Sequence, residues 1–279
     1  MRYLISMFLL LLLSSNTNAQ SQKISWDRDV YSKTILKWTS ALKETASVSS
    51  TTYIKKLSGG KDKLHNAKHR DVIYWIPRTT DLSKDFVVLL WFHGHNGFVK
   101  KRTFQNRTLK QLVPKAKQGK NFVLILPEMP WSVHGKTPTR RNGQIWENPG
   151  DFLIFIEDSL EVLKNHAGTE IGDPDFRIVG HSAGGSTIAT IGFTEDLCHI
   201  QPSRIVWSDS TYGRWLEKAN DKCLQMFPSD VFINGHKSTA TSPRRFTKTY
   251  KGRNVRIHLK RLTHKQIGDN IVKLSGVLD

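Results

Sequence analysis

The stretch FRIVGHSAGGSTIATI, residues 176–191, joins an apolar run, a glycine-rich turn and a second apolar run without interruption. At the turn, Gly180, Ser182 and Gly184 form the pattern G-x-S-x-G. A chain that reverses within so few residues holds the central residue in a strained backbone conformation, and glycines two positions before and after it avoid side-chain clashes. The stretch therefore predicts a strand, a sharp turn and a helix, with a serine exposed at the turn.

Outward from this turn, short buried strands alternate with helices along the chain. The clearest helix is 151–167, which Asp151 can cap and Gly168 can end. The strands are apolar on both faces, a pattern typical of a mostly parallel sheet covered by helices on both sides. The sequence therefore predicts the α/β class. The predicted strands are 71–76, 86–92, 122–126, 175–180, 204–208, 230–234 and 255–262.

Three features together resemble the α/β-hydrolase family over residues 70–270. They are the G-x-S-x-G turn, an H-G-x-x-G turn at 93–97 directly after a strand, and the Tyr-Trp-Ile-Pro strand that ends at Pro77. Within this region, residues 70–96 are similar to the secreted esterase and polyester-depolymerase branch. The resemblance implies the α/β-hydrolase fold, with a mostly parallel central sheet and helices on both faces. It also implies a serine hydrolase whose catalytic groups follow the chain order serine, acid, histidine.

The two turns supply the expected nucleophile and oxyanion hole. Ser182 is the predicted nucleophile. The backbone N–H groups of His95 and Ala183, with Asn96 as a neighbouring candidate, are expected to bind the developing oxyanion. His93 and His95 also form an H-x-H pair of the kind that ligates metals, so metal-assisted hydrolysis is an alternative. The chain contains no H-E-x-x-H motif, which weakens that alternative.

The general base is expected after the last strand. His264 follows the strand 255–262 and is the predicted base, which takes the Ser182 proton and later delivers it to the leaving group. His236, which follows the strand 230–234, is the competing candidate.

The acid departs from the pattern of most family members, which carry it after the seventh strand. The corresponding residues 235–240 contain no carboxylate. Asp209 directly follows the strand 204–208, and some family members place the acid after the sixth strand. Asp209 is therefore the predicted acid, and a turn-capping role for it is the alternative.

Three aromatic residues are candidates for the substrate pocket. Trp131, Trp146 and Tyr212 lie in loops after predicted strand ends, where an α/β sheet places its ligand groups. They are expected to line an acyl or aromatic pocket. Burial in the core is the alternative, since a buried tryptophan more often packs there.

The first nineteen residues have the pattern of a signal peptide. Arg2 precedes an apolar run over 3–13 that is too short to span a bilayer, and small residues at Thr17 and Ala19 fit a cleavage site. Cleavage after Ala19 predicts a secreted or periplasmic protein. The predicted organisation is a signal peptide over 1–19, a helical and loop extension over 20–69 with a loop at 47–68, and an α/β-hydrolase domain over 70–279.

Export makes a disulfide plausible between the two cysteines of the chain, Cys198 and Cys223. The bond would close a loop of about 25 residues and stabilise the fold by roughly 3 kcal/mol. Two buried thiols are the alternative. A redox role is disfavoured because the sequence has no C-x-x-C motif.

The charge is strongly positive, with 42 Lys and Arg against 24 Asp and Glu and a net charge of +18. Basic residues at 100–102, 140–141 and 244–245 suit an anionic polymer or the cell-envelope surface, although solvated surface charge is the alternative. The scatter of basic residues and the lack of a nucleic-acid-binding motif argue against nucleic acid. After the signal peptide no segment is apolar enough to span a membrane, and no cofactor is implied.

These inferences predict an exported serine hydrolase that cleaves an ester through an acyl-enzyme on Ser182. One alternative is a cell-wall peptide or amide hydrolase that uses the same three residues. Another is a catalytically silent α/β-hydrolase that serves as a binding module, which the missing carboxylate after the seventh strand would favour.

Overall fold

The computed structural model describes residues 50–56, 71–95, 103–104, 107–129, 145–212, 215–216, 224–234 and 254–279. Within these residues, eight strands form one sheet in the order β1-β2-β4-β3-β5-β6-β7-β8. The pairs β1–β2 and β2–β4 are antiparallel, and all later neighbours are parallel. The strands are β1 (Ser50–Lys56), β2 (Asp71–Pro77), β3 (Phe86–Phe92), β4 (Phe122–Pro127), β5 (Pro174–His181), β6 (Arg204–Ser208), β7 (Ser229–Asn234) and β8 (Val255–Lys260).

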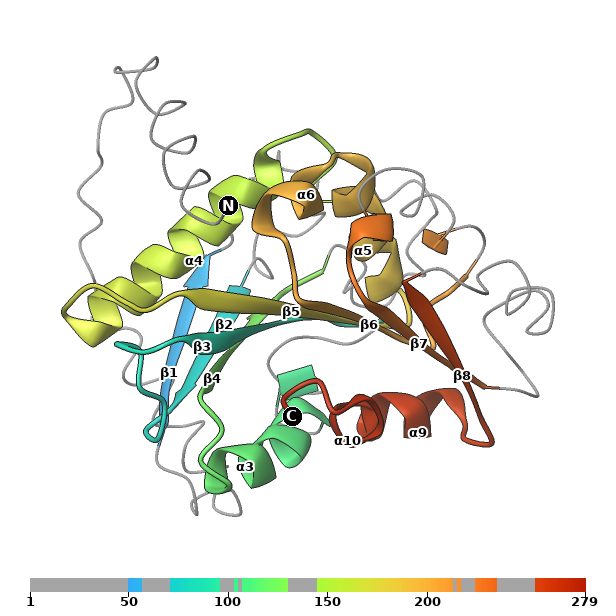
Figure 1. Cartoon of the computed structure of the whole chain (residues 1–279), viewed down its shortest axis with the longest axis horizontal. Helices are drawn as coiled ribbons and strands as arrows, with labels where there is room; N and C mark the ends of the chain where they lie inside the picture. The colour runs from blue at the N-terminus through green and yellow to red at the C-terminus, as the bar shows by residue number, and fades with distance from the viewer. Residues whose placement is uncertain are drawn as a thin grey trace.

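Helices cover both faces of this sheet, as Figure 1 shows. One face carries α4 (Asp151–Ala167), α5 (Gly184–Phe193) and α6 (Asp196–Ile200), and the other carries α3 (Leu109–Lys117), α9 (His264–Asp269) and α10 (Ile271–Ser275). A short 3-10 helix, η3 (Leu224–Met226), precedes β7. The predicted mostly parallel sheet between two layers of helices is confirmed.

The sheet separates two hydrophobic clusters, and β3 shows why its strands are apolar on both faces. Val88, Leu90 and Phe92 belong to the cluster on the α4 and α5 side. Leu89 and Trp91 belong to the cluster on the α3, α9 and α10 side. Because successive side chains of a strand point to opposite faces, a strand covered on both sides must be apolar throughout.

The N-terminal edge of the sheet differs from the prediction. β1 occupies part of the stretch 47–68, which the sequence analysis assigns to a loop, so the sheet begins before residue 70. Its backbone pairs with β2 in antiparallel register, with Tyr53 opposite Tyr74. This strand is held by a partner distant along the chain, a contact that local composition does not reveal.

The start of α4 also differs from the prediction. Its N-cap is Gly150 rather than Asp151, and the N-cap makes no side-chain cap bond. Instead the buried carboxylate of Asp196 on α6 accepts the N–H groups of Gly150 at 2.8 Å and Phe152 at 3.2 Å. A carboxylate at a helix N-terminus satisfies free N–H groups and opposes the helix dipole, so α6 stabilises α4 from outside the helix. Gly168 ends α4 in the left-handed conformation, as predicted.

No helix among the described residues is long and apolar enough to cross a membrane.

Candidate active site

Ser182 lies at the turn between β5 and α5, in the strained conformation that the sequence predicts. Its φ is +54°, in the left-handed region that residues with a side chain rarely adopt. Its N–H donates to the carbonyl oxygen of Ser208 on β6 at 3.1 Å, which fixes the turn to the neighbouring strand. A backbone of this kind costs on the order of 1–3 kcal/mol and persists only where surrounding structure imposes it.

The glycines after Ser182 are required by close backbone approach from both neighbouring strands. A Cβ on Gly184 would lie 2.1 Å from the carbonyl oxygen of Phe92 at the end of β3. A Cβ on Gly185 would lie 2.2 Å from the carbonyl oxygen of Ser210, just after β6. Any side chain at these positions would push α5 away from the sheet, so the glycines allow Ser182 to sit close above the strand ends.

Asp209 and His264 form a direct hydrogen bond. The Nδ1 atom of His264 lies 2.7 Å from Oδ2 of Asp209, and their side chains are 39% and 1% exposed. Because an ionised carboxylate can only accept a hydrogen bond, the Nδ1 atom of His264 must carry the ring proton. The Nε2 atom of the same ring can then accept a proton. This is the tautomer that a general base needs.

Asp209 is held as rigidly as the serine. It directly follows β6 with a φ of +45°, and its N–H donates to the carbonyl oxygen of Phe232 on β7 at 2.7 Å. The Asn234 N–H lies 3.4 Å from its Oδ1 atom. The carboxylate therefore stands at the carboxyl edge of the parallel strands, one strand away from Ser182. His236, the competing histidine, lies outside the described residues.

The start of α9 positions His264. Thr263 is the N-cap, and its hydroxyl accepts the Gln266 N–H at 3.2 Å. The Gln266 side chain accepts the Thr263 N–H at 2.9 Å in return. This reciprocal capping box makes His264 the first residue of the helix. The His264 ring stacks on His181, the residue before Ser182, with ring centroids 4.8 Å apart, so the base lies beside the turn that carries the serine.

The H-G turn after β3 lies against Ser182. A Cβ on Gly94 would lie 2.6 Å from the Ser182 Cβ and 3.2 Å from its Oγ. His95 follows in this turn, and Asn96 lies outside the described residues. Ala183 is the N-cap residue of α5. Backbone N–H groups at a helix N-terminus lack partners within the helix, and they favour a negative charge nearby. The two predicted sources of oxyanion donors therefore flank the serine.

The imidazole of His93 holds the H-G turn in place. Its Nδ1 donates to the Gly94 carbonyl oxygen at 2.8 Å, and its Nε2 accepts the Met129 N–H at 3.0 Å. Both ring nitrogens thus contact backbone groups, one in the turn and one just after β4, and the buried Glu128 Oε1 atom lies 3.1 Å from Nε2. His93 therefore fixes the H-G turn, and both of its ring nitrogens already have hydrogen-bond partners.

Tyr212, a predicted pocket residue, lies beside His264. The residue is 38% exposed, and its ring lies edge-on to His264, with centroids 6.4 Å apart, and to Trp215 at 5.4 Å. Burial raises the pKa of its phenol, while a hydrogen bond with Ser182 opposes that rise. Trp215 was not predicted from the sequence, although its place three residues after Tyr212 was an available signal.

Trp146 does not line the pocket, and that prediction is wrong. Its ring is fully buried beneath α4, with ring centroids 4.8 Å from Phe152, 4.9 Å from Phe155 and 5.8 Å from Phe92. Aromatic pairs of this kind each contribute about 0.5–1.5 kcal/mol beyond the area they bury, so the indole stabilises the core. Trp131 and the three basic clusters lie outside the described residues.

Neither a family model nor a curated protein matches the chain by sequence. Solved structures resemble it. A thermostable esterase has a TM-score of 0.50 at 13% identity, over 82% of this chain and 60% of that one. Esterase B from Lactobacillus rhamnosis scores 0.43 at 10% identity, over 88% and 94%. A serine hydrolase without a lid from Xanthomonas campestris scores 0.48 at 11% identity, over 81% and 91%.

At these identities the resemblance concerns the fold alone. Together with the strand order and the parallel register from β4 onward, this resemblance identifies the fold. The chain has the α/β-hydrolase fold.

Proposed function

We propose that this protein is a serine hydrolase that cleaves esters through an acyl-enzyme on Ser182. The observation that carries the proposal is the bond between Asp209 and His264 at 2.7 Å, made at the same sheet edge that holds Ser182 in its strained turn. A serine alone on such a turn is a weak nucleophile. A histidine that is oriented by a buried carboxylate supplies the base that activates it.

In the first half of the reaction, the Ser182 Oγ attacks the ester carbonyl carbon while Nε2 of His264 takes the hydroxyl proton. Asp209 stabilises the imidazolium without accepting that proton. The negative charge on the former carbonyl oxygen is stabilised by N–H groups of the H-G turn and of Ala183. The ester C–O bond then breaks, and His264 gives its proton to the departing alcohol.

In the second half, water replaces the alcohol. His264 takes a proton from the water, whose oxygen attacks the acyl carbon and forms a second tetrahedral intermediate. Collapse of this intermediate breaks the bond to Oγ, and the proton held by His264 returns to Ser182. The acid product leaves, and the free enzyme is restored.

Substrate preference is the finer part of the proposal. We assign esters rather than amides because alcohols are better leaving groups, and because the structure with the TM-score of 0.50 is named as an esterase. The exposed edge of Tyr212, with Trp215 beside it, provides an apolar aromatic rim for an acyl or aryl group.

A fluorophosphonate probe tests the proposed function directly. We expect one covalent adduct per chain, found by peptide mass spectrometry on the peptide that contains Ser182, together with hydrolysis of p-nitrophenyl esters of graded acyl length. Labelling without ester turnover, but with release of peptide fragments from cell walls, would favour the amide hydrolase. A folded protein that neither labels nor turns over any ester would favour the silent binding module.

Export is a further part of the proposal. Residues 1–19 have the sequence pattern of a cleaved signal, and the basic clusters of the sequence suit an anionic surface outside the cytoplasm. We propose a mature chain that begins at Gln20.

The proposed Cys198–Cys223 disulfide predicts a loss of stability on reduction. Cys198 packs against the core from α6, and Leu224, the residue after Cys223, is buried in the same cluster. Cys223 itself lies outside the described residues. Dithiothreitol is expected to lower the melting temperature by several degrees, because a bond across about 25 residues is worth roughly 3 kcal/mol. Titration of two free thiols in the exported, natively purified protein would contradict the pairing.

A further inference from the structure

His181 is a buried imidazole beside the nucleophile that the proposed mechanism does not use. It ends β5, is 3% exposed and contacts two residues of α9. Its ring stacks on His264, with centroids 4.8 Å apart and planes 27° apart. A Cβ on Gly268 would lie only 2.4 Å from its Cε1 atom. His264 and Gly268 are four residues apart and share one helix face, so the His181 ring lies directly beneath that face of α9.

The hydrogen bond of His181 fixes its tautomer and its orientation. Its Nδ1 lies 3.0 Å from the Ser208 carbonyl oxygen, which only accepts, so Nδ1 carries the proton. Burial lowers the pKa of His181 well below 6.5, and the positive charge of Arg107 and the proximity of His264 and His93 lower it further. The ring therefore stays neutral beside a base that becomes cationic in each half-reaction.

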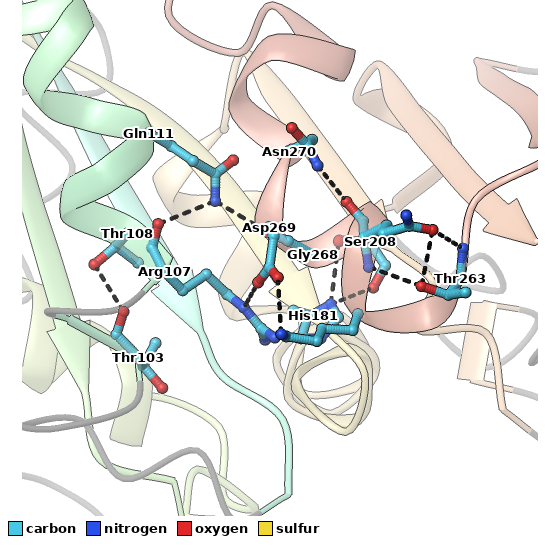
Figure 2. Close-up of polar contacts among 12 residues, drawn as sticks. Thr103, Arg107, Thr108, Gln111, His181, Ser208, Thr263, Gly268, Asp269 and Asn270 are labelled. Carbon is cyan, nitrogen blue, oxygen red and sulfur yellow. Dashed lines mark hydrogen bonds and ion pairs between the residues drawn. The ribbon is translucent and has the colours of Figure 1, made fainter.

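The segment before α3, together with α3 itself, holds α9 in place over this ring, as Figure 2 shows. The Arg107 Nε donates to Asp269 Oδ1 at 2.8 Å. The Gln111 side chain donates to the Gly268 carbonyl oxygen at 3.0 Å and accepts the Val272 N–H at 3.0 Å. The bonds to Asp269 and Gly268 oppose movement of α9 away from the imidazole beneath it, and the bond to Val272 holds α10, the next helix.

We propose that His181 is a positioning residue whose imidazole, fixed beneath α9, sets the plane of the His264 ring. The bond to Asp209 fixes one atom of the His264 ring but leaves the ring able to tilt about that bond. A flat surface against the ring face removes this tilt and keeps Nε2 aimed at Ser182. The inference rests on the proposed function, because it assigns His181 to the base of that same site.

Two substitutions distinguish the contribution of the His181 ring from the contribution of its hydrogen bond. His181→Asn keeps an N–H that can reach the Ser208 carbonyl oxygen but removes the flat ring. We expect it to lower kcat on a p-nitrophenyl ester about tenfold to a hundredfold with little change in KM, since a misplaced catalytic group loses rate rather than affinity. His181→Phe keeps a flat ring without the donor and should retain kcat within a few-fold.

Gly268→Ala tests the same contact from a second residue of α9. Its methyl group would collide with the His181 ring and displace it from His264, so kcat should fall in the wild-type background. In the His181→Asn background, the added methyl no longer meets a ring, and it should cause little further loss. Equal losses in both backgrounds would overturn the positioning role. The comparison of Gly268→Ala in these two backgrounds also keeps the proposal testable if His181→Phe fails to fold.

His258→Asn is the matched control. His258 also stacks on an aromatic ring, Phe232, with centroids 4.4 Å apart, and also bonds a carboxylate, Asp230, at 2.8 Å. It lies on β8 away from Ser182, so its loss should leave kcat and KM unchanged.

A measurement without substrate separates this inference from the proposed function. The proton between His264 Nδ1 and Asp209 Oδ2 should give a strongly deshielded NMR resonance in the resting protein. We expect it to broaden by exchange with water in folded His181→Asn and to stay sharp in His258→Asn. If wild type hydrolyses no ester but the resonance behaves this way, the proposed function fails and the positioning role stands. A sharp, unchanged resonance in folded His181→Asn overturns the positioning role, whatever the activity.

Discussion

Replacing Ser182 with alanine is expected to lower kcat by about six orders of magnitude, to the level that oxyanion donors and substrate binding provide without a nucleophile. The substitution removes one oxygen atom from a backbone that β5, β6 and α5 already hold in place. The melting temperature should therefore change little. Ester hydrolysis under saturating substrate, with thermal unfolding of the same sample, measures both effects.

Ser159→Ala is the control for this experiment. Ser159 is a buried serine on α4, and its hydroxyl donates to the Phe155 carbonyl oxygen at 2.7 Å. It lies 3.2 Å from the Tyr74 hydroxyl on β2, three strands away from β5 in the sheet. The Ser159→Ala variant should lose some stability and keep the activity of the wild type. Turnover by folded Ser182→Ala within a few-fold of wild type would exclude the serine mechanism.

Replacing Asp209 with asparagine is expected to lower kcat by about four orders of magnitude with KM nearly unchanged. An amide at this position favours the wrong tautomer of His264 and cannot stabilise the imidazolium. The backbone should tolerate the change, because asparagine accepts the left-handed conformation at least as well as aspartate. Steady-state kinetics on a p-nitrophenyl ester, with a thermal unfolding curve, separate loss of chemistry from loss of fold.

Asp230→Asn provides the matched comparison, because Asp230 is also a buried carboxylate bonded to a histidine. Although burial raises its pKa, hydrogen bonds from His258 and Arg204 bring it below the ordinary value, and Arg256 adds a further ion pair. Its loss should lower the melting temperature and leave kcat unchanged. If Asp209→Asn instead lowers stability and keeps near-normal kcat, Asp209 is a structural residue of its turn.

Most of the sheet could be predicted from the sequence because its strands are covered on both faces. In β3, neighbouring side chains enter different hydrophobic clusters, so the whole run is apolar and its limits are sharp. β1 could not be predicted in this way. It lies in a polar stretch, and the backbone of β2 that holds it is distant along the chain.

The candidate site was predictable where its residues directly follow strands. Ser182 is marked by a local pattern of glycines, and Asp209 is the first residue after a buried run. Contacts across the chain were not predictable. Asp196 stabilises a helix that begins 45 residues before it, and Trp146 turns back into the core although it follows a strand in the sequence. His181 lies inside the glycine-rich turn, and only the stack on His264 shows which residue it packs against.

The backbone bonds from Ser182 to β6 and from Asp209 to β7 bear on how the protein can evolve. The separation of these two residues is set by the spacing of adjacent strands, about 4.8 Å per step, rather than by any loop above them. Insertions and substitutions in the loops at this edge can therefore alter which molecules reach the candidate site without changing the separation of Ser182 and Asp209. Proteins that evolve from this chain can thus differ in the loops and keep the serine and the carboxylate in the same relative position.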